Sequence, residues 1–150
     1  MISSKASDKR SYSSKCQPKR RRTATTLATY TTGILRRPPG TQFALVDAVN
    51  LSAFSRSVTV RVYDWSSGTP VALPVFPCET RSCTLWLGAN RSDFLYADVS
   101  NVQFKYEVRI TRLADRNLVT NVFGVSNTPF TPQTGGTVLQ KNLVRIRRMR

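Results

Sequence analysis

Short stretches of alternating apolar and polar residues recur along most of this chain, about every ten residues, with turn residues between them. The clearest is SRSVTVRVYDW, where Val58, Val60 and Val62 fall on one side of a strand and Thr59 and Arg61 on the other. No stretch keeps helical periodicity for more than about two turns. The pattern predicts about eight or nine strands in one all-β sandwich, a jelly roll by strand count, with an immunoglobulin-like topology as the alternative.

Three details refine this prediction. VALPVF carries Pro74 inside the run, which predicts an edge or bulged strand. VQFKYEVRI predicts a strand with Phe104 and Tyr106 on its apolar face, and GVSNTPFTPQTGG predicts a long loop suited to surface contact. The region 40–146 holds nearly all the large apolar side chains, among them Trp65, Trp86, Phe104 and Phe123.

The formal charge of +15 is concentrated at the two ends of the chain. Between Pro38 and Gln140, eight basic residues face seven acidic ones, so this body is nearly neutral. The other fifteen positive charges lie in the first 37 residues and the last ten, with Asp8 as the one acid among them. Such asymmetry indicates interaction tails on a neutral domain.

These observations divide the chain into four parts. Residues 1–22 are rich in Ser, Lys and Arg and predict a flexible basic arm. Residues 23–39 read as a strand-like connector that Pro38 ends, residues 40–146 as the β-sandwich domain, and residues 147–150 as a basic tail.

Nothing in the sequence indicates catalysis. The chain has no His, its acids are scattered singly near turns, and no glycine-rich phosphate loop is present. We therefore expect no enzyme, no cofactor, no metal ion and no small-molecule substrate. A secretory signal and an apolar run of membrane-spanning length are also missing, so we expect neither Sec export nor a membrane span.

The three cysteines offer a route to crosslinking. Cys78 and Cys83 flank ETRS, whereas Cys16 lies alone in the basic arm. Three free thiols are one reading, and a four-coordinate zinc site is disfavoured because no imidazole is available. The odd count supports the other reading, in which Cys16 bonds to Cys78 or Cys83 of a neighbouring subunit.

From VTVRVYDWSSGTPVAL through YADVSNVQFKYEVRI to TVLQKNLVRI, the chain resembles small β-sandwich proteins of spore-forming Firmicutes. It is more loosely similar to the jelly-roll subunits of endospore appendages. That resemblance implies an N-terminal connector whose cysteine, here Cys16, bonds to other subunits' sandwiches, here at Cys78 or Cys83. A rival resemblance, in architecture alone, is to capsid proteins of small positive-strand RNA viruses.

Two functions follow as expectations. In the first, the protein is a structural subunit that assembles with copies of itself into a surface fibre or shell, on a spore or cell surface. The stretch TATTLATYTT would then complete a neighbour's sheet, through Thr25, Leu27, Thr29 and Tyr30.

In the second, the protein is a capsid or RNA-binding protein of a virion or the cytoplasm. Its basic arm would neutralise phosphates without reading sequence. The residues expected to do so are Lys15, Lys19, Arg20, Arg21 and Arg22.

Overall fold

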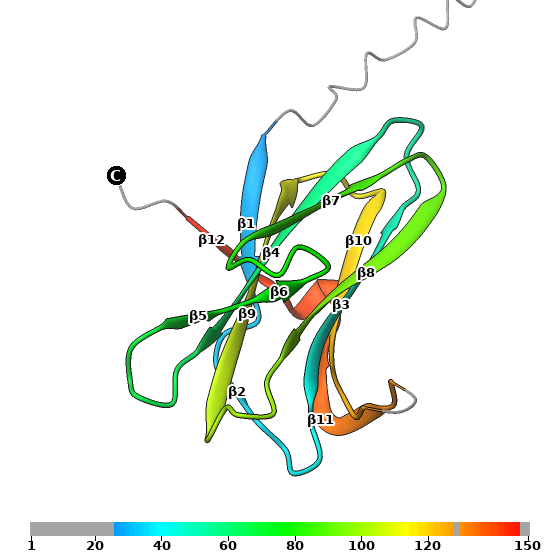
Figure 1. Cartoon of the computed structure of the whole chain (residues 1–150). Coiled ribbons are helices and arrows are strands. Elements are labelled where there is room, and N and C mark those ends of the chain that lie inside the picture. The colour runs from blue at the N-terminus through cyan, green and yellow to red at the C-terminus, as the bar shows by residue number, and fades with distance from the viewer. Residues whose placement is uncertain (1–25, 128–129, 148–150) are drawn as a thin grey trace, which may run out of the picture.

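The computed structural model describes residues 26–127 and 130–147, which form two antiparallel sheets packed face to face (Figure 1). The first sheet runs in the order β12 (Val144–Ile146), β1 (Leu27–Thr31), β9 (Lys105–Leu113), β4 (Arg56–Asp64) and β5 (Val71–Leu73). In that sheet β2 (Leu35–Arg36) also pairs with β9, and β7 (Cys83–Leu87) also pairs with β4. The second sheet runs in the order β11 (Pro132–Val138), β10 (Leu118–Val125), β3 (Phe43–Asn50), β8 (Arg91–Asp98) and β6 (Val75–Phe76). A short 3-10 helix, η1 (Gln140–Asn142), precedes β12.

The strand pairs are nested along the chain. β1 pairs with β12, β3 with β10, β4 with β9, and β6 with β8. Such nesting is produced when one long hairpin is rolled up, as in a jelly roll. The all-β sandwich predicted from the sequence is confirmed, while its basic arm lies outside the described residues.

The core lies between the two sheets and is built mainly from small and β-branched side chains. Val58, Val60 and Val62 of β4 are fully buried, as the alternation in the sequence predicts. From the opposite sheet, Val46 and Leu95 close the core on the other side.

Four of the large aromatic residues of the region 40–146 lie outside the core. Trp86 is 71% exposed, because its neighbours on β7 face inward and alternation turns it outward. Phe104 is half exposed because β9 begins one residue after it. Trp65 and Phe123 are only partly buried, and Phe123 lies on the outer face of the second sheet beside the inward-facing Val122. The core is therefore formed mainly by aliphatic side chains and not by these four residues.

Pro74 separates β5 from β6, and the chain changes sheets at that point. Both strands lie at the edge of their sheets, so the edge assignment is confirmed. The segment predicted as a connector contains β1 and β2, and both strands belong to the first sheet. The sandwich therefore begins at Leu27 and not at residue 40.

Candidate functional site

The sequence-predicted site residues fall into two groups. Cys16, Thr25, Lys15, Lys19 and Arg20–Arg22 lie outside the described residues, so their predicted roles stay predictions. The remaining ones, on β1 and around β7, have defined surroundings.

Cys78 and Cys83 form a disulfide with each other, with their Cα atoms 5.5 Å apart. The bond closes the short loop that leads into β7, where Cys83 itself is fully buried. Neither sulfur is then free to bond with Cys16 of another subunit. The predicted intermolecular pairing is corrected here, because the two cysteines lie close enough in the fold to satisfy one another.

The residues predicted to add to a neighbour's sheet already lie inside their own sheet. β1 is paired on both sides, with β9 and with β12, so it has no free edge to offer. The hydroxyl groups of Thr29 and Thr111 are 2.9 Å apart across the β1–β9 pair, while Tyr30 lies under the guanidinium of Arg112. Leu27 starts the strand and is largely exposed. Strand addition by this segment is therefore corrected to pairing within the chain.

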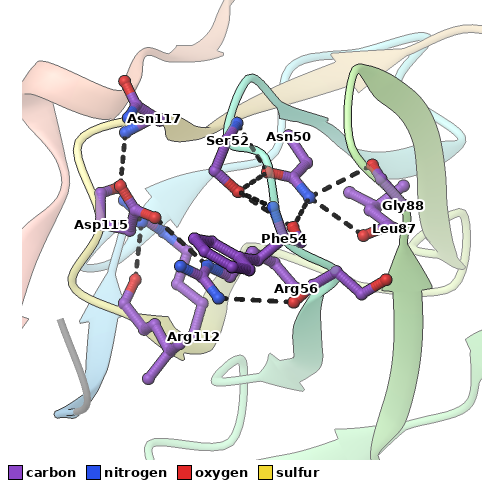
Figure 2. Close-up of polar contacts among 11 residues, drawn as sticks. Asn50, Ser52, Phe54, Arg56, Leu87, Gly88, Arg112, Asp115 and Asn117 are labelled. Carbon is purple, nitrogen blue, oxygen red and sulfur yellow. Dashed lines mark hydrogen bonds and ion pairs between the residues drawn. The ribbon is translucent and has the colours of Figure 1, made fainter. Parts of the chain in front are cut away.

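A buried polar network joins the two sheets at one end of the sandwich (Figure 2). The side-chain nitrogen of Asn50, in β3, donates to the carbonyl oxygens of Leu87 (3.0 Å), Gly88 (3.2 Å) and Phe54 (2.7 Å). Its side-chain oxygen accepts from the backbone and hydroxyl of Ser52. Because Asn50 is fully buried and satisfied by backbone groups, the network has the properties of a structural brace.

A second polar group lies beside this brace. Arg112 is 3% exposed, stacks 4.8 Å from the ring centroid of Tyr30, and donates to the carbonyl oxygens of Leu113 and Asp115. Burial lowers the pKa of the Arg112 guanidinium from its ordinary value.

The Asp115 carboxylate fixes the turn that follows β9. It accepts from the backbone N–H of Asn117 and from Arg56 Nε, at 2.9 and 3.2 Å, and these contacts hold its pKa below the usual value (Figure 2). These contacts join the turn to the start of β4.

The outer face of the first sheet carries a basic depression of about 740 Å³. Its lining includes four arginines, Arg61, Arg109, Arg145 and Arg147, and no acidic residue. They come from β4 and β9, from β12, and from the residue directly after β12, so no short sequence motif could have revealed them. We call this feature the arginine depression.

One of these four arginines, Arg109, forms an ion pair with Glu107. Its carboxylate accepts hydrogen bonds from Arg109 Nε at 3.0 Å, from Trp65 Nε1 at 2.9 Å and from the Thr31 hydroxyl. Burial alone would raise the pKa of Glu107, but these three donors outweigh it and the pKa is lowered. The Arg109 guanidinium also lies 4.6 Å from the ring centroid of Tyr63, so it is held in a fixed position.

The outer face of the second sheet carries a cluster of five aromatic rings, Phe43, Phe76, Phe94, Tyr96 and Phe130, which we call the aromatic surface. Phe43 and Tyr96 meet edge to face at 5.4 Å, and Phe76 stacks on Tyr96 at 5.2 Å. Phe130, from the segment predicted as a long loop, contacts Phe43, Phe94 and Tyr96. Phe94 is 40% and Phe130 41% exposed, so the rings form a continuous apolar area that water reaches.

The described residues contain no group of His, Cys, Asp and Glu side chains that could hold a metal ion. They also contain no helix long and apolar enough to cross a bilayer. Burial raises the pKa of Tyr106 to about 12, but this phenol lies in the core and reaches no open surface.

No protein-family model, no curated protein and no solved structure matches this chain. The arginine depression and the aromatic surface differ in their chemistry. One is basic with exposed donors, the other aromatic and apolar, and they lie on opposite faces of the sandwich.

Proposed function

We propose that this chain is a non-enzymatic structural subunit that assembles with copies of itself. The observation that carries the proposal is the aromatic surface, where Phe94 and Phe130 remain about two-fifths exposed beside Tyr96, the ring that contacts the other four. Exposed contiguous apolar area rimmed by polar groups is typical of protein interfaces, and aromatic residues are enriched there.

A second copy is the partner that this surface fits. Aromatic rings pack well against other aromatic rings, and a two-fold axis would bring the same surface of a second copy against these rings. Asp47 pairs in register with Phe94 across β3 and β8 and provides a polar border. Burial raises the pKa of its carboxyl.

In this proposal the subunit belongs to a fibre or shell at a spore or cell surface, the setting that its resemblance to spore proteins implies. Joining through the sheet face replaces joining through β1, which is occupied within its own sheet. Contributions from the basic arm remain a prediction from the sequence.

The test compares two phenylalanines of similar exposure. Phe94→Thr removes a ring from the aromatic surface but keeps strand propensity, whereas Phe104→Thr removes a half-exposed ring elsewhere. Sedimentation velocity of the full chain over a range of concentrations should show self-association that Phe94→Thr weakens at least about tenfold, the effect of one interface hot spot. Phe104→Thr should associate like the wild type.

Two results would contradict the proposal. One is a wild-type chain that stays monomeric at every concentration. The other is an equal loss of association in the two variants, which would show that general surface hydrophobicity drives it. Negative-stain microscopy of the wild type then distinguishes fibres from closed shells.

A second candidate is nucleic-acid binding. The observation that favours it is the arginine depression, which adds basic groups on the sandwich to those that the sequence places in the arm.

A further inference from the structure

The arginine depression contains more positive charge than the fold needs. Arg61 and Arg109 are direct partners across β4 and β9, an arrangement that costs stability because like charges face one another. Glu107 compensates Arg109. Among the described residues, the side chains of Arg61, Arg145 and Arg147 make no hydrogen bond or ion pair. Three arginines without such a partner contribute to the lining of one hollow, which favours an anionic ligand.

Both basic ends of the chain leave the sandwich beside this depression. β1 and β12 are antiparallel neighbours in which Thr29 lies opposite Ile146, so the start of one strand and the end of the other share one end of the sheet (Figure 1). The sequence preceding this point carries eight basic residues before Thr23, and the sequence following it carries Arg148 and Arg150. The fold thus places residues 26 and 147, from which the two basic ends of the sequence continue, at the same end of the sheet, which favours a ligand with many negative charges.

The same face also carries an exposed aromatic side chain. Trp86 of β7 lies opposite Ser57 of β4. Residues two apart on a strand point to the same side, so Ser57, Thr59 and Arg61 of β4 share one face. The Thr59 hydroxyl contacts that of Thr84 on β7, and Trp86, two residues after Thr84, therefore points outward on the face that bears Arg61. The separation along β4 between Ser57 and Arg61 is roughly 13 Å at the usual rise per residue. A strand of nucleic acid could place phosphates in the depression and a base on the indole, because every nucleotide carries both a phosphate and a flat ring.

We propose that the arginine depression together with Trp86 binds single-stranded nucleic acid, without sequence preference. In this proposal Arg61, Arg145 and Arg147 contact phosphates, and Trp86 stacks with a base. Arg109 is held in a fixed position by its contacts with Glu107 and Tyr63. Thr29 and Thr111, which line the depression, share one hydrogen bond, and the remaining hydroxyl hydrogen is a donor of the kind that commonly binds phosphate oxygens. This inference does not depend on self-association, since the two surfaces lie on different sheets.

The experiment uses the full chain and a labelled oligouridylate of about 20 nucleotides, followed by fluorescence anisotropy at several salt concentrations. The double variant Arg61→Gln with Arg145→Gln removes two exposed, unpaired arginines and leaves the core untouched. The matched control, Arg91→Gln with Lys141→Gln, removes the same charge from exposed sites on β8 and η1. For the first pair we expect the Kd to rise about tenfold. We also expect the slope of the logarithm of affinity against the logarithm of salt concentration to become shallower by about 1.4, because each phosphate contact to a single strand contributes about 0.7 to that slope. The control pair should change Kd less than about twofold.

Trp86 supplies an independent readout. Trp86→Ala should weaken binding of the oligouridylate about tenfold and leave binding of inorganic polyphosphate unchanged, whereas Trp86→Tyr should restore binding. Thermal melting of each variant confirms that the fold is retained, which is expected because Trp86 is 71% exposed.

Three outcomes would overturn the proposal. If the two double variants weaken binding equally, the tails alone bind the nucleic acid. If Trp86→Ala has no effect, the ligand is a polyanion in general and not a nucleic acid. If Arg61→Gln with Arg145→Gln changes sedimentation but not nucleic-acid binding, this face holds a second copy of the chain.

Discussion

At the scale of single residues, Glu107 connects stability to charge. It is 5% exposed and accepts hydrogen bonds from Thr31, Trp65 and Arg109. These residues lie in β1, directly after β4, and in β9. Its pKa in the folded chain is lowered from 4.5. The ionised carboxylate therefore stabilises the fold above its unfolded-state pKa, and this contribution is lost as the pH falls through the folded-state pKa.

Glu107→Gln should lower the free energy of unfolding by about 2 kcal/mol near neutral pH, because charge-assisted hydrogen bonds are replaced by neutral ones. The difference from the wild type should shrink at acid pH, where the wild-type carboxyl is itself protonated. Urea denaturation at about pH 7 and about pH 3 measures both values. Asp93→Asn, at an exposed position, controls for the loss of one negative charge, and an equally large penalty at both pH values would contradict the assignment.

At the scale of elements, the sequence predicts which residues form strands and which side of a strand is buried, but not which strands pair. Val58, Val60 and Val62 could be assigned to the core because alternation is a local property. TATTLATYTT could be recognised as a strand by composition, yet its partner residue Thr111 lies 82 positions from Thr29. The arginine depression escaped prediction for the same reason, since its arginines are spread from Arg61 to Arg147.

The position of β1 gives a test at this scale. Removing residues 1–22 should leave a cooperative thermal transition near that of the full chain, because β1 is intact. Removing residues 1–36 should destabilise the domain by several kcal/mol, since β12 loses its partner strand and buried Arg112 loses the Tyr30 ring. Differential scanning calorimetry compares the two. If both shortened chains melt alike, β1 is a detachable connector, as its composition suggested.

At the scale of the whole molecule, charge and apolar area act in opposite directions. The net charge of +15 makes copies repel one another, while the aromatic surface favours their association. Repulsion of this kind is screened by salt, with a Debye length of about 10 Å at 0.1 M. Burial of aromatic rings is not weakened by screening.

Raising the salt concentration from about 50 to about 500 mM should therefore strengthen self-association and weaken nucleic-acid binding. Sedimentation equilibrium measures the first and anisotropy with oligouridylate the second, on the same preparation. Phe94→Thr should remove the salt-strengthened association and leave nucleic-acid binding as it was, because the aromatic surface and the arginine depression lie on different sheets. Arg61→Gln with Arg145→Gln should do the reverse. If association also weakened with salt, ionic contacts between copies would hold the assembly, and the aromatic surface would lose its proposed role.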